Sequence, residues 1–242
     1  MQVSAPKSMT DRCVFASAKS PGARHLDRCE DSILVVQKDG WFIAAVADGA
    51  GSADRAAEGS ALAVSVWHSV APHAFASENP AEEFLNAFLA AIPAEADRAG
   101  LATTFLGFVA HENNALFLQL GDGAGVVFQD DFEVLVPPPH HEFVNVTQFL
   151  TDPDALTHFK TVRISCPQRL ALFSDGLQYL VLSPDDQPHR PFFEAVFRTL
   201  KSIDGEDSAS CEWLAQMLKS NFVTDKTDDD TSVVIAKFGE LP

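Results

Sequence analysis

The first part of the chain alternates between short apolar runs and polar turns. Residues 32–37 and 41–47 are rich in strand-forming side chains, and Asp39-Gly40 lies between them. Two such runs around an Asp-Gly dipeptide are typical of a β-hairpin, because both turn residues tolerate a positive φ. The pattern therefore predicts two antiparallel strands joined by a tight turn.

After residue 53 the apolar spacing becomes helical. Apolar side chains recur four positions apart as far as about residue 75, as they do on one face of a helix. A second helix is predicted to open at Asn79-Pro80. Asn79 is an N-cap residue, proline suits the first helical position, and Glu82 would complete a capping box.

Strand patterns return in the second half of the chain and are followed by two further helices. The predicted strands are residues 102–110, 115–120, 125–129, 133–136, 162–165, 169–174 and 231–238, and the predicted helices are residues 191–200 and 208–218. Consecutive strands joined by short turns indicate antiparallel sheets, and helices grouped in pairs would cover them. The predicted fold class is therefore an α+β sandwich.

One domain is predicted to span residues 1–242, because the chain contains no repeat, low-complexity tract or linker. Residues 137–160 open with three prolines, and their apolar residues follow neither the helical nor the strand period. An irregular stretch of this length inside one domain is often functional, so we expect it to be a loop beside the site.

Composition indicates a globular protein, since 46% of the residues are hydrophobic and only 21% are charged. No apolar run approaches the roughly 20 residues of a membrane span. The first ten residues lack the apolar region of a signal peptide, so a cytoplasmic location is expected. The four cysteines are scattered and have no zinc or redox spacing, which favours buried free thiols.

The formal net charge of −17 disfavours nucleic-acid binding, which requires a basic surface. Two interpretations of the acidity remain. The acidic side chains form a solvated surface, or some of them converge on cations. The positions of the aspartates decide between these interpretations.

Asp-Gly occurs five times in the chain. Asp39-Gly40 is predicted to be a hairpin turn and Asp204-Gly205 a helix stop. Asp48, Asp122 and Asp175 each follow an apolar strand, where an unpaired carboxylate at the rim of the core is costly. For Asp122 a simple hairpin turn between two strands is an equally good interpretation.

Two further acidic segments lie next to strands. Glu30-Asp31 precedes the first strand of the hairpin, and residues 228–230, all aspartate, precede the last strand. Taken by itself, either segment is interpreted as a solvated loop. Five segments that place oxygen ligands at strand ends, with no nearby constellation of His or Cys residues, indicate Mg²⁺ or Mn²⁺ rather than zinc. Two such ions roughly 4 Å apart can activate water and neutralise a phosphoryl group.

In this arrangement the sequence resembles the metal-dependent PP2C-type (PPM) protein phosphatases, particularly their compact bacterial members. The matching motifs, in the order of the family, are Glu30-Asp31-Ser32, Val46-Ala47-Asp48-Gly49-Ala50-Gly51, Thr103-Thr104, Gly121-Asp122-Gly123, Ser174-Asp175-Gly176 and Asp229-Asp230-Thr231-Ser232-Val233-Val234. The motifs span nearly the whole chain, and their order makes the set specific.

The resemblance implies a four-layer αββα sandwich, with two antiparallel sheets flanked by helix pairs and two metal ions at one end of the sheets. Asp48 would bridge both ions, and the Gly49 carbonyl would join one of them. Asp175 and Asp229 would hold the other ion.

The resemblance implies more peripheral roles in the metal site for the remaining acidic residues. Glu30 and Asp31 would contact the site, partly through water, and Asp122 would help to hold a third, weaker ion. The catalytic residues Asp48, Asp175 and Asp229 would act through a metal-bound water as the nucleophile. Residues 137–160 would form the variable flap.

Two positions depart from the family pattern. Leu26 occupies the place of an arginine that binds substrate phosphate, so Arg24, His25 or Arg28 would have to take over that role. Ala50 stands where some members carry a histidine general acid, so leaving-group protonation would fall to water or another group.

The leading hypothesis is a Mg²⁺- or Mn²⁺-dependent phosphatase acting on phosphoserine and phosphothreonine. Its expected partner is a phosphoprotein that is the target of a cognate Ser/Thr kinase, and the enzyme is expected to be a monomer with no nucleic-acid or membrane partner. A small-molecule phosphoesterase using the same site is one alternative. A non-catalytic regulatory module that keeps the fold is another, and a scaffold with surface aspartates only would show no metal effect.

Overall fold

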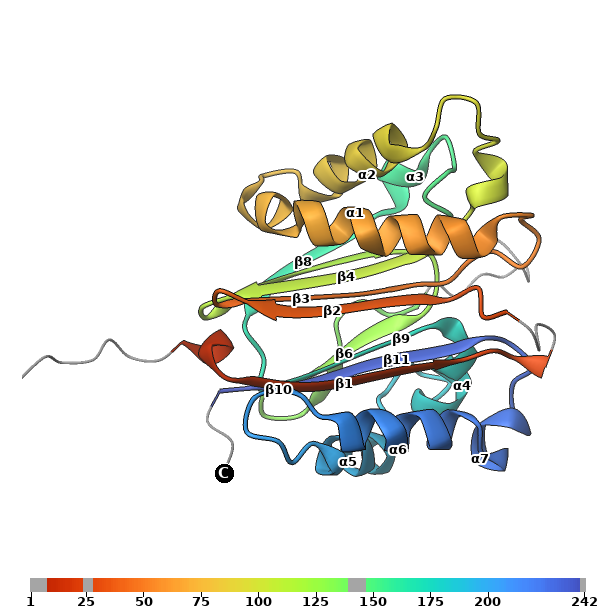
Figure 1. Ribbon diagram of the computed structural model, residues 1–242. Helices are drawn as coiled ribbons and strands as arrows, with labels where there is room; N and C mark the ends of the chain where they lie inside the picture. The colour runs from red at the N-terminus through yellow and green to blue at the C-terminus, as the bar shows by residue number, and fades with distance from the viewer. Residues whose placement is uncertain (1–7, 24–27, 139–146, 240–242) are drawn as a thin grey trace, which may run out of the picture.

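The chain folds into four layers, two β-sheets lying face to face with helices on both outer surfaces (Figure 1). The computed structural model describes residues 8–23, 28–138 and 147–239. The αββα sandwich that the resemblance implied is confirmed.

One sheet is antiparallel throughout and has the strand order β2-β3-β4-β5-β8. Its strands are β2 (Ser32–Lys38), β3 (Trp41–Ala47), β4 (Phe105–His111), β5 (Asn114–Leu120) and β8 (Lys160–Ser165). The predicted hairpin is β2-β3, in which Ser32 pairs with Ala47 and Lys38 with Trp41. Its turn residues Asp39 and Gly40 both have positive φ, as a tight hairpin turn requires.

The other sheet has the order β10-β1-β11-β9-β6-β7. Its strands are β1 (Cys13–Ser20), β6 (Ala124–Phe128), β7 (Phe132–Val134), β9 (Arg169–Phe173), β10 (Gly205–Glu206) and β11 (Thr231–Phe238). All pairings are antiparallel except that of β10, which runs parallel to β1.

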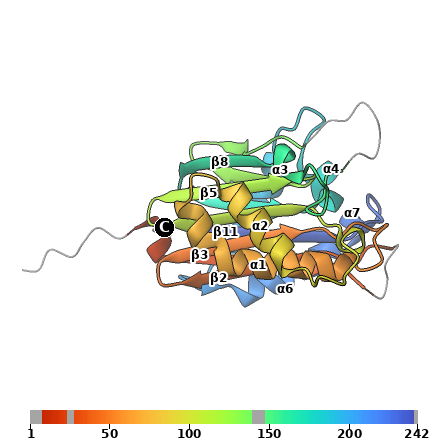
Figure 2. The ribbon, with the colours of Figure 1, turned by 90° about the horizontal axis from the view of Figure 1, so that it is seen from above.

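Helices cover the outer face of each sheet. The α-helices are α1 (Ala56–Ala76), α2 (Pro80–Ala91), α3 (Ala155–His158), α4 (Gln178–Val181), α5 (Arg190–Thr199), α6 (Ser208–Leu218) and α7 (Asn221–Thr224). Helices α1 and α2 lie over the five-stranded sheet, as the view from above shows (Figure 2), and α5 and α6 lie under the six-stranded sheet (Figure 1). Among these helices of the described residues, none is long and apolar enough to cross a membrane.

The buried side chains form three apolar layers between these four structural layers. In β3, Ile43 and Ala45 face the helices, whereas Phe42 and Ala44 face the other sheet. Because a strand directs successive side chains to opposite faces, a strand covered on both sides must be apolar at every position. This explains the unbroken apolar run of residues 41–47.

Three local predictions are corrected by the structure. Strand β1 was not predicted, although it pairs with β11 along its whole length. The capping box at the start of α2 is not formed, since Asn79 makes no side-chain cap hydrogen bond. Asp204-Gly205 is not a helix stop, because α5 ends at Thr199 and Gly205 begins β10. The Asp204 carboxylate accepts hydrogen bonds from the Cys13 N–H and the Gln37 side chain instead.

Candidate metal centre

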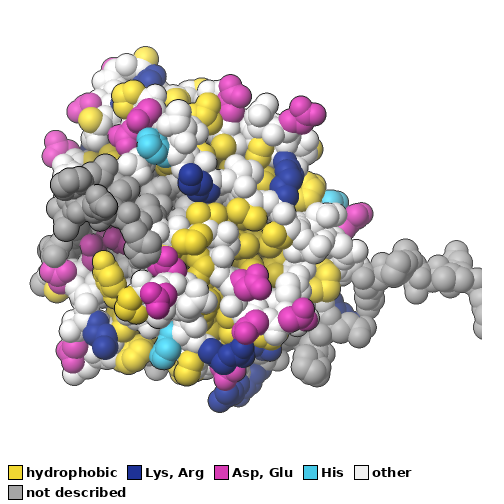
Figure 3. Space-filling view, turned by 180° about the vertical axis from the view of Figure 1, so that it is seen from behind, with side chains coloured by type: hydrophobic (Ala, Val, Ile, Leu, Met, Phe, Trp, Pro, Cys, Tyr) yellow, Lys and Arg dark blue, Asp and Glu magenta, His cyan; other side chains and the backbone are white. Residues whose placement is uncertain are grey.

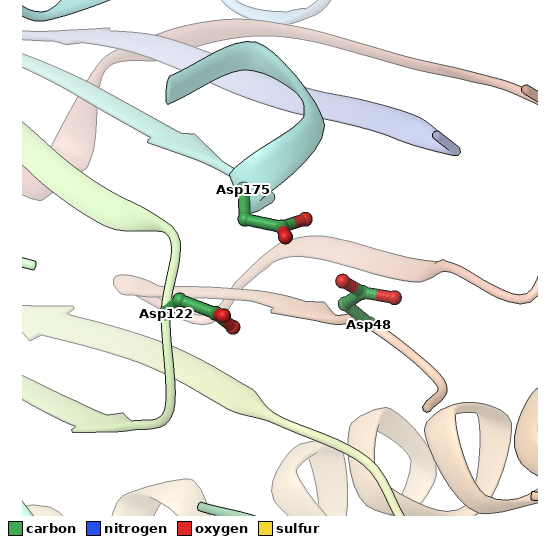
Figure 4. Close-up of side chains that lie close together, drawn as sticks. All are labelled: Asp48, Asp122 and Asp175. Carbon is green, nitrogen blue, oxygen red and sulfur yellow. The ribbon is translucent and has the colours of Figure 1, made fainter. Parts of the chain in front are cut away.

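Three carboxylates converge at one end of the sandwich. Asp48 follows β3, Asp122 follows β5, and Asp175 follows β9, so both sheets contribute. Each offers one oxygen atom, and these three atoms lie within 4.8 Å of one another. Figure 4 shows the three side chains reaching from separate elements toward a shared space. They open onto a hollow of about 430 Å³ that Gly49 and Asp229 also line.

Asp48 is fixed by the backbone and side chains of Thr103 and Thr104. The Thr103 hydroxyl and the Thr104 N–H each donate to the Asp48 carbonyl at 2.8 Å, and the Asp48 N–H donates to the Thr104 hydroxyl. A Cβ on Gly49 would lie 2.7 Å from the Ala56 carbonyl, so only glycine fits where α1 approaches. This contact network accounts for the Thr103-Thr104 motif.

Asp122 lies on a connection between the two sheets. Strand β5 belongs to the five-stranded sheet and β6 to the six-stranded sheet, so the hairpin interpretation of Asp122 is wrong. Gly121 and Gly123 on either side have φ of +85° and +80°, a region that favours glycine. The Thr147 hydroxyl donates to the Asp122 carboxylate at 2.8 Å. Thr147 belongs to the predicted loop 137–160, so the described part of this loop reaches the site.

Asp175 begins a short 3-10 helix, η4 (Asp175–Leu177), directly after β9. A Cβ on Gly176 would lie 2.1 Å from the Asp230 carbonyl oxygen, so this glycine lets η4 and the start of β11 approach closely. Asp229 lines the hollow, and its carboxylate accepts the Asp230 N–H at 2.9 Å.

Asp230 is a structural residue that the sequence analysis did not single out. It is buried, and its two carboxylate oxygens accept the N–H groups of Gly22 and Glu30. These bonds tie the segment before β2 to the start of β11. The available signal was its place beside the predicted ligand Asp229 in a run of three aspartates. The sequence alone does not tell a metal ligand from a carboxylate that accepts structural hydrogen bonds.

Asp31 is completely buried between the sheets. Its Oδ2 accepts the hydroxyls of Ser174 at 2.8 Å and Ser232 at 2.6 Å, and its Oδ1 is buried without a hydrogen-bond partner. Glu30 is also buried, and its Oε1 accepts a hydrogen bond from the half-exposed guanidinium of Arg28 at 2.5 Å. Arg24 and His25, the other predicted phosphate contacts, lie outside the described residues.

Three carboxyl groups at this end of the molecule, those of Asp31, Asp48 and Asp175, resist ionisation when no cation is bound. Burial raises the pKa of Asp48 well above its usual value, and the charges of Asp31 and Asp175 raise it further. Burial raises the pKa of Asp175 to about 7, and repulsion from the Asp122 charge is the second cause. Burial also raises the pKa of Asp31 to about 6, although the hydrogen bond from Ser232 opposes this rise. Desolvation and like charges are the causes that a bound cation would offset.

The residues present fit a hard divalent cation. All the donors are oxygen atoms, and buried oxygens of Asp31 and Asp175 lack partners. Within the described parts of the chain, no Lys or Arg side chain pairs with the carboxylate of Asp31, Asp48 or Asp175. By contrast, other acidic side chains are spread over the rear face of the molecule (Figure 3), so much of the acidity is solvated surface.

The sequence also matches a family profile. The description of that profile is protein phosphatase 2C, and it matches residues 22–220. The chain belongs to the protein phosphatase 2C family.

A relative within this family is serine/threonine-protein phosphatase 3 of Escherichia coli (strain K12). It is 31% identical to this protein phosphatase 2C chain over 258 residues, which cover 96% of this chain and 100% of the relative. The match therefore extends over nearly the whole length of both chains.

Several solved structures share the fold. The serine/threonine phosphatase of S. agalactiae superposes with a TM-score of 0.66 at 15% identity, covering 94% of this chain and 100% of that one. The catalytic domain of the serine/threonine protein phosphatase PstP, solved with two manganese ions, gives 0.62 at 16% identity, covering 95% and 99%. RsbX, solved with magnesium, gives 0.61 at 16% identity, covering 95% and 96%.

Proposed function

We propose that this protein phosphatase 2C chain is a Mg²⁺- or Mn²⁺-dependent enzyme that hydrolyses phosphoserine and phosphothreonine on proteins. The observation that carries the proposal is the convergence of Asp48, Asp122 and Asp175 within 4.8 Å, with no basic side chain among the described residues to neutralise Asp48 or Asp175. An all-oxygen site of this kind suits Mg²⁺ or Mn²⁺. The two-manganese and magnesium structures of PstP and RsbX support the same choice of metal.

Two ions would be held by residues of this chain. In the proposal Asp48 would help to hold both ions and the Gly49 carbonyl one of them, while Asp175 and Asp229 would hold the second. Asp122 would contribute to a weaker third ion, and Glu30 and Asp31 would act from the periphery. When bound, such ions supply the activation of water and the neutralisation of phosphoryl oxygens.

The protein's own part in the reaction is positioning. Thr103 and Thr104 hold Asp48 through its backbone. Arg28, kept beside Glu30 by its ion pair, is the described candidate for contacting substrate phosphate, and Arg24 and His25 stay predictions. Ala50 lines the hollow and has no proton to donate, so we infer that protonation of the leaving oxygen falls to water or another group.

The alternatives are less well supported. A regulatory module without catalysis has no need for carboxylates that converge at a desolvation cost. A small-molecule phosphoesterase would use the same site, so it differs only in substrate. The single domain over residues 1–242, the monomeric state, the cytoplasmic location and the cognate kinase stay predictions of the sequence.

Chelation tests the proposal directly. Hydrolysis of an aryl phosphate is expected to require Mn²⁺ or Mg²⁺ and to fall to background in EDTA, because the carboxylates alone cannot neutralise a phosphoryl group. The initial rate is measured in both conditions, and excess Mn²⁺ added after EDTA should restore it. Equal rates with and without chelator would show that the metal-dependent mechanism is wrong.

Substrate class is tested separately with phosphopeptides. Phosphoserine and phosphothreonine peptides are expected to have a higher kcat/KM than phosphotyrosine peptides of matched sequence, as the family assignment implies. Phosphate release measured on the three peptides decides this. A preference for phosphotyrosine would change the substrate assignment and leave the metal proposal intact.

A further inference from the structure

The segments that hold Asp31 come from opposite sheets. Asp31 directly precedes β2 of the five-stranded sheet, whereas Ser174 follows β9 and Ser232 lies in β11 of the six-stranded sheet. All three side chains are buried. Two hydroxyls from one sheet therefore close on a single carboxylate oxygen from the other.

The backbone favours one direction for the hydrogen bond between Ser174 and Asp31. The Ser232 N–H donates to the Ser174 Oγ at 3.0 Å, so that oxygen is already an acceptor. Its own proton is available for Asp31 Oδ2, which lies 2.8 Å away. The Ser232 hydroxyl, 2.6 Å from the same Oδ2, donates the second bond. Two donors on one oxygen favour the ionised carboxylate.

The other oxygen of Asp31 is left for a different role. Oδ1 is buried and has no hydrogen-bond partner. A buried acceptor without a partner is costly, and such an atom calls for an explanation such as an ion or a water. Asp31 also lies beside Asp48 and Asp175, because Ser32 pairs with Ala47 in the β2-β3 hairpin and because Ser174, which contacts Asp31, directly precedes Asp175. The unpaired oxygen therefore belongs to the same polar region as the metal centre.

We propose that Ser174 and Ser232 are positioning residues that clamp Asp31 through Oδ2 and so present Oδ1 to the metal centre. The inference rests on the proposed metal binding and extends it to two hydroxyls that touch neither the hollow nor the substrate. Partners that orient a ligand or its water typically change metal affinity by about 10- to 100-fold when removed.

The test is calorimetric titration of Mn²⁺ into metal-free protein. Ser174→Ala and Ser232→Ala are each expected to raise the Kd for Mn²⁺ by about 10-fold or more. The matched control is Ser210→Ala in α6, which removes a buried hydroxyl that has no hydrogen-bond partner. This variant should keep the wild-type Kd for Mn²⁺. Ser174→Thr and Ser232→Thr retain a hydroxyl and should restore most of the affinity.

The outcomes separate the two proposals. If wild-type protein binds no Mn²⁺, the proposed function is wrong and this inference falls with it. If wild type binds Mn²⁺ and both alanine variants bind it equally well, the hydroxyls only satisfy a buried charge and the positioning role is wrong. Circular dichroism of each metal-free variant establishes that it is folded. Where an alanine variant unfolds, the Kd of the Thr variant is compared with that of the Cys variant at the same position, because the thiol is a weaker hydrogen-bond donor than a hydroxyl.

Discussion

Asp48→Asn is expected to lower kcat by about 10³-fold, equivalent to about 4 kcal/mol of transition-state stabilisation. The substitution keeps the size of the side chain and removes one negative charge from the centre of the site. One carboxylate oxygen of Asp48 lies within 4.8 Å of one oxygen each of Asp122 and Asp175, so loss of its charge should weaken the binding of both predicted ions. Asp175→Asn and Asp229→Asn should also lower kcat by orders of magnitude. Turnover of an aryl phosphate at saturating Mn²⁺ measures the effect.

Asp39→Asn is the matched control for this loss. It makes the same chemical change at another Asp-Gly pair at an end of β3, but in the hairpin turn, where Asn-Gly serves equally well. Its kcat should stay close to that of wild type. If the Asp39 variant were as inactive as the Asp48 variant, the division of the Asp-Gly pairs into turns and ligands would be mistaken.

Millimolar Mn²⁺ is expected to raise the melting temperature of the wild type by about 5–10 °C. Two carboxylates about 5 Å apart at an effective dielectric constant near 20 repel by roughly 3 kcal/mol, and three gather at this site. Bound cations remove that repulsion. At a concentration 100 times Kd they add about 2.7 kcal/mol to the free energy of unfolding, which gives the stated shift for a domain of this size.

Asp48→Asn provides the internal comparison for the same measurement. Without metal the variant should be at least as stable as wild type, because asparagine replaces a carboxyl group whose ionised form is disfavoured by burial and by the neighbouring charges. With Mn²⁺ its melting temperature should rise less than that of wild type, because its affinity for the ions is lower. A thermal unfolding curve of the wild type that does not respond to millimolar Mn²⁺ would exclude a carboxylate site that binds cations.

Elements whose stability is local were predictable from the sequence. The β2-β3 hairpin has its turn signal at Asp39-Gly40, and α1 has a long helical period of apolar residues. Both elements can therefore be recognised from the local sequence without knowledge of their distant partners. Strand β11 begins at the predicted residue, Thr231. For β11 the apolar pattern and the burial of the element agree. In α1 the apolar positions four residues apart, Leu62, Val66 and Val70, are only partly buried, and Ala63, Trp67 and Ala71 form the buried face.

Strand β1 was missed because tertiary contacts, not composition, make it a strand. Of its eight residues only Val14 and Phe15 favour β structure, and the others are Ala, Ser, Lys and Cys. It is held by β11 on one side and β10 on the other. Strand propensity depends strongly on such neighbours, which a single sequence does not contain.

The site was predicted as a set of segments but not as a three-dimensional arrangement. The sequence placed Asp48, Asp122 and Asp175 at strand ends, and these three do converge. It left Asp122 open as a hairpin turn, because only the sheet order shows that β5 and β6 belong to different sheets. The serine contacts of Asp31 join residues 143 and 201 positions away, a separation that no local pattern encodes.

The carboxylates of the site come from both sheets, and this makes catalysis sensitive to residues far from it. The distance between Asp48 and Asp175 follows from how closely the sheets approach, which the side chains between them set, among them Leu106, Phe117 and Leu172. Protein interiors are packed tightly enough that a change of one methylene is felt by its neighbours. Natural variation in this middle layer is therefore expected to be narrower than folding alone would require. Substitutions in the two outer layers, which pack helices and leave the spacing of the sheets unchanged, can accumulate more freely during evolution.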